Sequence, residues 1–200
     1  MNAKRSNWQV TRRYFLRASS ATLLAAPLFH PWPVPSGPWR FFDEAEAETV
    51  NAICERIIPA DDDPGAAWAG VVHFIDRKLA GYYRRHQELY RLGLQGVRES
   101  SLDLFAKRFV ELAAGEQDDL LRKLESNQAP GDVWKKIPAG EFFNRVVEHT
   151  LQGFYGGPRH GGNRDAVSWR MLRLPTAPVR SRRPLTAPWA GTPDSPADKR

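Results

Sequence analysis

The chain has 200 residues, of which 42% are hydrophobic, and this allows one modest core. Its formal net charge of +6 is uneven, because residues 41–175 contain 18 basic and 21 acidic side chains while both ends are basic. The part expected to fold is therefore mildly acidic, which argues against nucleic acid as a partner. A single cysteine, Cys54, excludes an internal disulfide and any CxxC metal, haem or redox motif.

Residues 1–29 have the pattern of an export signal. The adjacent Arg12 and Arg13 are followed by Tyr-Phe-Leu, with Phe15 and Leu16 at the expected positions, and then by a short apolar run. The run is too short for an ordinary transmembrane helix, and the paired arginines match the twin-arginine consensus. We expect the protein to be exported in its folded state by the twin-arginine translocase into the periplasm. Whether the signal is cleaved or stays as a membrane tether is left open.

Two other segments are predicted to lie outside the folded domain. Residues 30–40 are rich in proline and tryptophan, which is typical of an extended spacer. Residues 176–200 are rich in proline, alanine and arginine and have no apolar period, which predicts a disordered tail. The domain is therefore expected to occupy residues 41–175.

About five helices are predicted in this domain. Asp43 and Glu46 have the spacing of a capping box, which opens a first helix that ends near Pro59. Apolar residues at three- and four-residue spacing predict the others. The second covers 71–82, with Tyr82 on its apolar face, and its continuation to residue 92 is left open. The remaining three cover 102–112, 116–124 and 141–151. No stretch alternates with a period of two. We therefore expect an all-α fold: one compact helical domain followed by a glycine-rich C-terminal loop.

Two features of the first helices have functional and structural interpretations. Cys54 lies in an apolar stripe, so a buried thiol is expected, with an intermolecular disulfide as the alternative. The run Asp61–Asp63 suggests calcium, but Ala66 and Val72 stand where an EF-hand loop needs glycine and glutamate. A solvated turn is therefore expected at these aspartates.

Residues 153–175 form the most unusual segment of the chain. Five glycines and Pro158 fall within ten positions, which predicts that no regular helix or strand runs through them. Aromatic and charged residues lie among these glycines, whereas a flexible linker would be small and polar. A folded loop that makes contacts is expected here, either with a partner or with the core of its own domain.

No motif of a self-sufficient enzyme is present. The sequence contains no GxSxG, HExxH or P-loop motif, and its glycine cluster follows a helix rather than the strand that a dinucleotide site requires. An acid–base set built from His149, His160, Arg164 and Asp165 is supported only by proximity in sequence. No catalytic, cofactor-binding or metal-binding residue is therefore assigned.

Three segments together resemble the gluconate 2-dehydrogenase subunit 3 family. They are the twin-arginine leader, the stretch ICERIIPADDDPGAAWAG with the following FIDRKL, and the closing signature GFYGGPRHGGNRDAVSWRMLRLP. Together they span about residues 11–175. Two departures from the family pattern are Ser168, where glycine is common, and Arg159-His160, where an acidic or aromatic residue is usual.

The resemblance implies a non-catalytic small subunit of a membrane-associated, periplasmic sugar or polyol dehydrogenase. In such complexes a flavoprotein of the GMC type holds FAD and oxidises the substrate, and a cytochrome c subunit with haem c passes the electrons on. The small subunit holds no cofactor. It is expected to bind the folded flavoprotein, lend it the twin-arginine signal and remain as a structural subunit.

Resemblance and composition together select the residues expected to bind the partner: Phe154, Tyr155, Asn163, Arg164, Asp165 and Trp169. Aromatic and arginine side chains dominate the energies of most interfaces. Alternatives stand beside this hypothesis. Phe154 and Trp169 are also suited to fill the helical core, and Arg164 and Asp165 to pair with each other or cap a helix.

Two other functions remain open at this stage. One is a stand-alone periplasmic enzyme that uses His160, Arg164 and Asp165. The other is a signal-tethered scaffold for a different partner.

Overall fold

The computed structural model describes residues 39–174. The predicted export signal, the predicted tail and most of the predicted spacer lie outside the described residues. Within 39–174 there are α-helices and short 3-10 helices and no strand, which confirms the all-α prediction. The α-helices are α2 (Glu44–Ile57), α3 (Val71–Leu79), α4 (Gln87–Phe105), α5 (Ala114–Glu125), α6 (Ala139–Tyr155) and α7 (Val167–Met171). The 3-10 helices are η1 (Arg84–His86), η2 (Phe109–Glu111), η3 (Asp132–Lys135), η4 (Pro158–His160) and η5 (Arg164–Ala166).

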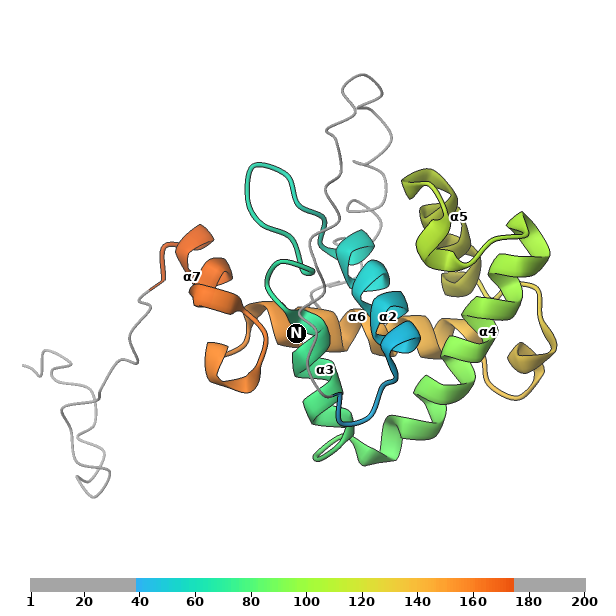
Figure 1. Ribbon diagram of the computed structural model, residues 1–200, viewed down its shortest axis with the longest axis horizontal. Helices are drawn as coiled ribbons and strands as arrows, with labels where there is room; N and C mark the ends of the chain where they lie inside the picture. Colours follow the sequence, from blue (N-terminus) through green and yellow to red (C-terminus); the bar gives the residue numbers. More distant parts are fainter. Residues whose placement is uncertain (1–38, 175–200) are drawn as a thin grey trace, which may run out of the picture. The chain divides into compact units, whose positions relative to one another are not determined.

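Helix α6 is the element against which the others pack. It contacts α2, α3, α4 and α5 along its length, and α7 lies beyond its C-terminal end (Figure 1). Phe142, Val146, Thr150 and Gly153 recur at three- and four-residue spacing and are all buried, so one face of the helix lies in the core. The C-terminal end of α6 carries the glycine-rich segment away from this core.

Helix α2 begins as the sequence predicts. The carboxylate of Asp43 accepts the amide of Glu46 at 2.8 Å, and the carboxylate of Glu46 accepts the amide of Asp43 at 3.0 Å. This reciprocal capping box satisfies two amides that have no partner inside the helix. Its apolar stripe is buried, and Cys54 within it is fully buried, which confirms the buried-thiol prediction.

The pattern over 71–92 does not form one helix. Helix α3 ends at Leu79, and the amide of Tyr83 donates to the carbonyl of Lys78 at 2.7 Å to close a turn. Tyr82 was expected on the buried face but is 77% exposed. The turn at Gly81 ends the helix, although the apolar residues on either side of it keep a helical spacing. The spacing alone therefore does not show where the helix ends.

The helix predicted over 102–112 is also absent. Leu102 belongs to the last turn of α4, which stops where Ala106 adopts the left-handed conformation with φ of 54°. The hydroxyl of Ser101 donates to the carbonyl of Lys107 at 2.6 Å and stabilises this reversal. Phe109 is then buried from the short helix η2.

Asp76 fixes the start of the described chain against α3. Its buried carboxylate accepts the amides of Arg40 at 3.0 Å, Phe41 at 2.9 Å and Phe42 at 3.1 Å. Just before them, the ring of Trp39 stacks on His73 of α3 with ring centroids 4.8 Å apart. A charged acceptor that satisfies three consecutive amides holds this segment in one conformation.

Polar groups inside the core are paired across helices. The hydroxyl of Tyr90 and Nδ1 of His149 are 3.0 Å apart, and the His149 ring also stacks on Tyr83. Burial lowers the pKa of His149 to about 3. The thiol of Cys54 lies 3.2 Å from the hydroxyl of Thr150, and burial raises its pKa to about 12. Both groups are therefore uncharged at neutral pH.

Candidate partner-binding site

The last turn of α6, the two short helices η4 and η5, and helix α7 form a folded unit, residues 153–174, called here the C-terminal module. Two details differ from the sequence prediction. Helix α6 runs through Gly153 to Tyr155, and residues 167–171 are helical rather than part of a loop. The backbone amide of Arg164 donates to the carbonyl of Ala69 and joins the module to the rest of the domain.

The glycines of the module are required by close packing. A Cβ on Gly162 would lie 2.4 Å from the carbonyl oxygen of Gly153, so the two backbone segments are in direct contact. A Cβ on Gly153 would lie 3.0 Å from the side chains of Val71 and Phe74 on α3. Gly161 has φ of 109°, a conformation that residues with side chains rarely adopt. The module can therefore lie against α6, and α6 against α3.

Hydrogen bonds hold the module in one arrangement. Asn163 donates from Nδ2 to the carbonyl of Gly156 at 2.8 Å and accepts the amide of Ser168 at its Oδ1 at 3.0 Å. The indole N–H of Trp169 donates to the carbonyl of Tyr155 at 3.0 Å. A rigid scaffold is the setting in which surface side chains bind with little loss of entropy.

The six predicted contact residues divide into two groups. Phe154 and Asn163 are fully buried, so their side chains support the domain and the module from inside, and Phe154 fills the core as the alternative interpretation expects. Tyr155, Arg164 and Asp165 are exposed. The remaining residue, Trp169, is partly exposed. Partner contact stays a prediction for these last four.

Arg164 and Asp165 are not joined by an ion pair in the part of the chain that the structure describes. The backbone amide of Arg164 donates to the carbonyl of Ala69 at 3.0 Å, and its guanidinium lies over the ring of Trp68, 5.7 Å from the centroid. Only the backbone carbonyl of Asp165 is engaged, by the side chain of Arg170. Both charged side chains are therefore available at the surface.

Three exposed leucines in and beside the module were not predicted from the sequence, whereas their exposed neighbour Tyr155 was. Leu172 is 56% exposed and Leu174 is 49% exposed, and Leu151 and Tyr155 are exposed one turn apart on α6. The amide of Leu174 donates to the carbonyl of Trp169 at 2.7 Å, which holds the end of the module next to the indole. The signal was present in the sequence as apolar residues that follow the tryptophan without a further helix to bury them.

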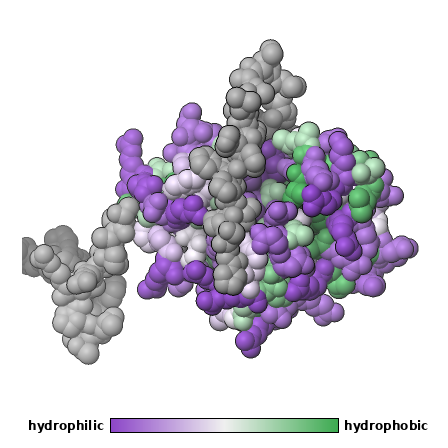
Figure 2. All heavy atoms as spheres, in the orientation of Figure 1, coloured by the Kyte–Doolittle hydropathy of each residue, from purple (hydrophilic) through white to green (hydrophobic). Residues whose placement is uncertain are grey.

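The module also carries an excess of positive charge. It contains Arg159, Arg164, Arg170 and Arg173 but one acidic residue, Asp165, although the domain as a whole is mildly acidic. Hydrophilic atoms cover most of this part of the molecule on the face shown in Figure 2. Apolar side chains beside arginines have the composition of an interface.

The acid–base residues considered above do not form a set. His149 is buried against Tyr90, whereas His160 is exposed and its Nε2 accepts a hydrogen bond from Arg159 at 3.2 Å. Within residues 39–174, no hydrogen bond or ion pair joins His160 to Arg164 or Asp165. The described residues also contain no group of three His, Cys, Asp or Glu side chains placed to hold a metal ion.

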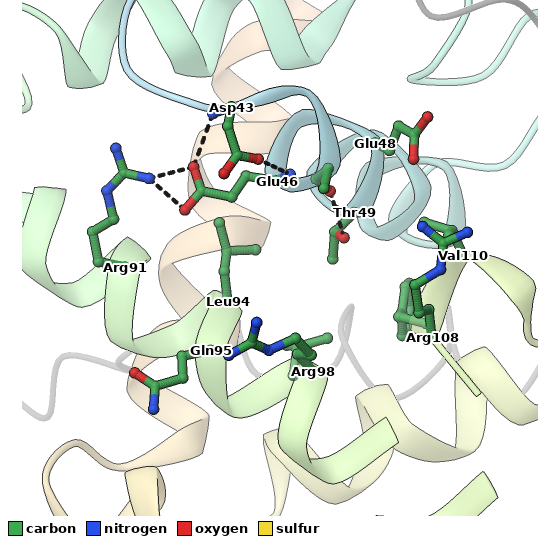
Figure 3. A pocket seen from close by; sticks show the side chains of 13 residues that line it. Asp43, Glu46, Glu48, Thr49, Arg91, Leu94, Gln95, Arg98, Arg108 and Val110 are labelled. Carbon is green, nitrogen blue, oxygen red and sulfur yellow. Dashed lines mark hydrogen bonds and ion pairs between the residues drawn. The ribbon is translucent and has the colours of Figure 1, made fainter. Parts of the chain in front are cut away.

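A hollow lies between α2, α4 and η2 and has a volume of about 260 Å³ (Figure 3). Arg91 on its lining pairs with Glu46, and Arg108 pairs with Glu111. Most of its charges are thus satisfied within the domain, and its volume is below the roughly 300 Å³ at which ordinary ligand pockets begin. We therefore describe it as a groove between helices and assign it no ligand.

None of the helices in residues 39–174 is long and apolar enough to span a bilayer.

Comparison with known proteins adds one finding. The family model described as Gluconate 2-dehydrogenase subunit 3 matches residues 44–175, well over half of the chain. The match begins with α2 and ends with the C-terminal module, so it covers nearly the whole described domain. Comparisons with curated proteins and with solved structures gave no match.

Proposed function

The chain belongs to the gluconate 2-dehydrogenase subunit 3 family, and on this premise we propose that it is a non-catalytic small subunit of a periplasmic dehydrogenase complex. The other subunits of this complex are a GMC-type flavoprotein that holds FAD and a cytochrome c subunit. The C-terminal module of the small subunit binds the folded flavoprotein. Catalysis and cofactors reside in the partners.

One observation carries this proposal. Tyr155, Leu172 and Leu174 stay exposed on a module whose backbone is fixed by Asn163 and by the indole of Trp169. Exposed apolar side chains grouped on a rigid unit, beside arginines, support a protein–protein interface rather than a solvated surface. Burying one large apolar side chain contributes roughly 1.5–3 kcal/mol to association.

Export is part of the same proposal. The flavoprotein has to receive FAD before it leaves the cytoplasm, so it crosses the membrane folded. A bound partner with the leader that contains Arg12, Arg13, Phe15 and Leu16 supplies the twin-arginine signal for both chains. The complex then remains attached to the inner membrane through its subunits or through the leader itself.

The test is co-purification. We would express the full chain with the flavoprotein subunit, recover the complex through a tag on the small subunit and record its flavin absorption spectrum. A yellow complex with about one flavin per small subunit is expected. Small subunit recovered without flavoprotein would overturn the proposal.

Matched variants locate the surface. Tyr155→Ala combined with Leu172→Ala is expected to reduce the retained flavin at least tenfold, since each removes an exposed anchor. The control is Leu102→Ala combined with Leu104→Ala, which removes two exposed leucines from the end of α4. If both pairs have the same effect, the module is not the binding surface.

A further inference from the structure

Two arginines lie where the C-terminal module packs against α3. Arg77 belongs to α3, and its guanidinium lies against the loop, with Nη1 3.1 Å from the position that a Cβ on Gly161 would take. Arg164 reaches the same place from the module, with Nη2 3.6 Å from the Cβ position of Gly70. The carbonyl oxygen of Gly161 is also 3.6 Å from that position. Both guanidinium groups therefore lie at the place where Gly70 and Gly161 approach each other.

The charge of this arginine pair is not neutralised within the described residues. Arg56, Arg91, Arg108, Arg122 and Arg145 each form an ion pair, whereas Arg77 and Arg164 form none. Asp76 is the neighbouring acid, but its carboxylate already accepts three backbone amides. Two exposed positive charges are thus left beside each other without a counter-charge.

His73 lies at the same place, since its Cδ2 is 3.7 Å from the Cβ position of Gly70. It lies one helical turn before Arg77, and its ring is half-buried beneath Trp39. Burial lowers the pKa of His73, and the charges of Arg77 and Arg164 lower it further. The histidine is therefore neutral, and the positive charge of the site comes from the two guanidinium groups.

Both side chains are in contact with the domain before any partner arrives. The Arg164 backbone is fixed by its hydrogen bond to Ala69, and its guanidinium lies over Trp68. The guanidinium of Arg77 packs next to Gly161, where a Cβ would lie 3.1 Å from its Nη1. Guanidinium groups that are already positioned lose little entropy when they bind a carboxylate, and their fork geometry favours two parallel hydrogen bonds.

We propose that Arg77 and Arg164 together receive an acidic side chain, Asp or Glu, of the partner flavoprotein. This inference rests on the proposed function and adds a second, electrostatic contact to the apolar one. The apolar residues supply burial, and the arginine pair fixes the orientation of the partner and speeds the encounter. The small subunit would thus select a partner that presents a carboxylate next to an apolar patch.

The experiment is a titration of the purified full chain with the flavoprotein subunit at low and high salt. Arg77→Gln combined with Arg164→Gln is expected to weaken binding roughly tenfold at low salt and to flatten the salt dependence. Arg84→Gln combined with Arg98→Gln is the control. It removes two exposed arginines elsewhere for which no ion pair is seen in the described residues, and it changes the net charge by the same amount as the Arg77/Arg164 variant. Its affinity is expected to stay within about twofold of wild type.

The outcomes separate the two proposals. If the wild-type chain binds and the Arg77/Arg164 variant binds equally well, the acid-docking inference is wrong while the partner-subunit proposal stands. If the wild-type chain does not bind the flavoprotein, both are wrong.

A separate measurement uses inorganic phosphate at matched ionic strength. Thermal stabilisation of wild type but not of the variant by millimolar phosphate would assign the site to a free anion and overturn the partner carboxylate.

Discussion

The carboxylate of Asp76 accepts the backbone amide of Phe41 at 2.9 Å, and the same group accepts the amides on either side of it. A side chain in the middle of α3 therefore fixes the segment that leads into α2. Since Trp39 also stacks on a residue of α3, the beginning of the described chain is attached to this helix at two points.

Replacement of Asp76 by alanine is expected to lower the free energy of unfolding by about 3 kcal/mol. The reason is that three amides lose a charged acceptor, and the amide of Phe42 is buried. Urea unfolding followed by circular dichroism measures this change. Asp103→Ala, an exposed aspartate on α4, is the control and should stay within about 0.5 kcal/mol of wild type. Equal losses in the two variants would show that the carboxylate has no special role.

Gly162→Ala is expected to detach the C-terminal module or to lower the free energy of unfolding by more than about 2 kcal/mol. The added methyl group would lie 2.4 Å from the carbonyl oxygen of Gly153, and neither backbone can move without disturbing the contact of α6 with α3. Limited proteolysis near residue 160 and thermal unfolding both report the change. Gly115→Ala on α5 is the matched control, because nothing lies within 4 Å of its added methyl, and it should be neutral or stabilising.

The stability of the domain is expected to fall in mild acid because of His149. Its pKa is about 3 in the folded state against 6.5 for an unperturbed histidine. Well above pH 6.5, His149 is neutral in both the folded and the unfolded state, so it adds no pH dependence to the free energy of unfolding. Below pH 6.5, His149 of the unfolded chain binds a proton, whereas the buried His149 of the folded domain stays neutral. The loss between pH 7 and pH 5 amounts to about 2 kcal/mol.

His149→Phe tests this assignment. Phenylalanine keeps the stacking with Tyr83 and cannot titrate, so most of the pH dependence between 7 and 5 should disappear. A smaller slope of the same sign remains from His73 and His86, whose pKa values are also lowered by burial. At pH 7 the variant should be less stable by about 1–3 kcal/mol, because the buried hydroxyl of Tyr90 loses its partner. An unchanged slope would mean that His149 is not the titrating group.

Ser168→Ala is expected to leave the fold intact and to raise the free energy of unfolding by up to about 1 kcal/mol. The hydroxyl of Ser168 is buried and has no hydrogen-bond partner among the described residues. The hydrogen bond from the backbone amide of Ser168 to Oδ1 of Asn163 is unaffected by the change. Calorimetric unfolding checks the sign, and a marked loss of stability would show that the hydroxyl is satisfied in solution.

The sequence predicted the features that depend on local chemistry. The capping box of Asp43 and Glu46 and the buried stripe with Cys54 follow from residue type and spacing, and the structure confirms both. The boundaries near Tyr82 and Ala106 were missed, because apolar spacing continues through a turn and nothing in an alanine signals a left-handed backbone. Both errors lie where tertiary contacts override the local pattern.

The candidate site was also predicted only in part, because local chemistry marks the segment but tertiary contacts decide which of its side chains are exposed. Glycines and aromatic residues marked residues 153–175 as a contact segment, but Phe154 and Asn163 are buried within it. Which residues of such a segment face outward depends on a backbone contact between Gly153 and Gly162 that no periodicity encodes. Arg77 and Arg164 are far apart in the chain, and only the fold places both at the contact between Gly70 and Gly161.

The hydrogen bond between the thiol of Cys54 on α2 and the hydroxyl of Thr150 on α6 joins residues 96 positions apart. Because every other long helix packs on α6, the ribosome must synthesise α6 before the core can close. Under the proposed export mechanism, the leader would therefore be synthesised well before the core can close. A receptor that binds such a leader during synthesis would therefore bind a chain whose core is not yet folded. A receptor that requires a folded cargo with its partner bound can act only when synthesis is almost complete.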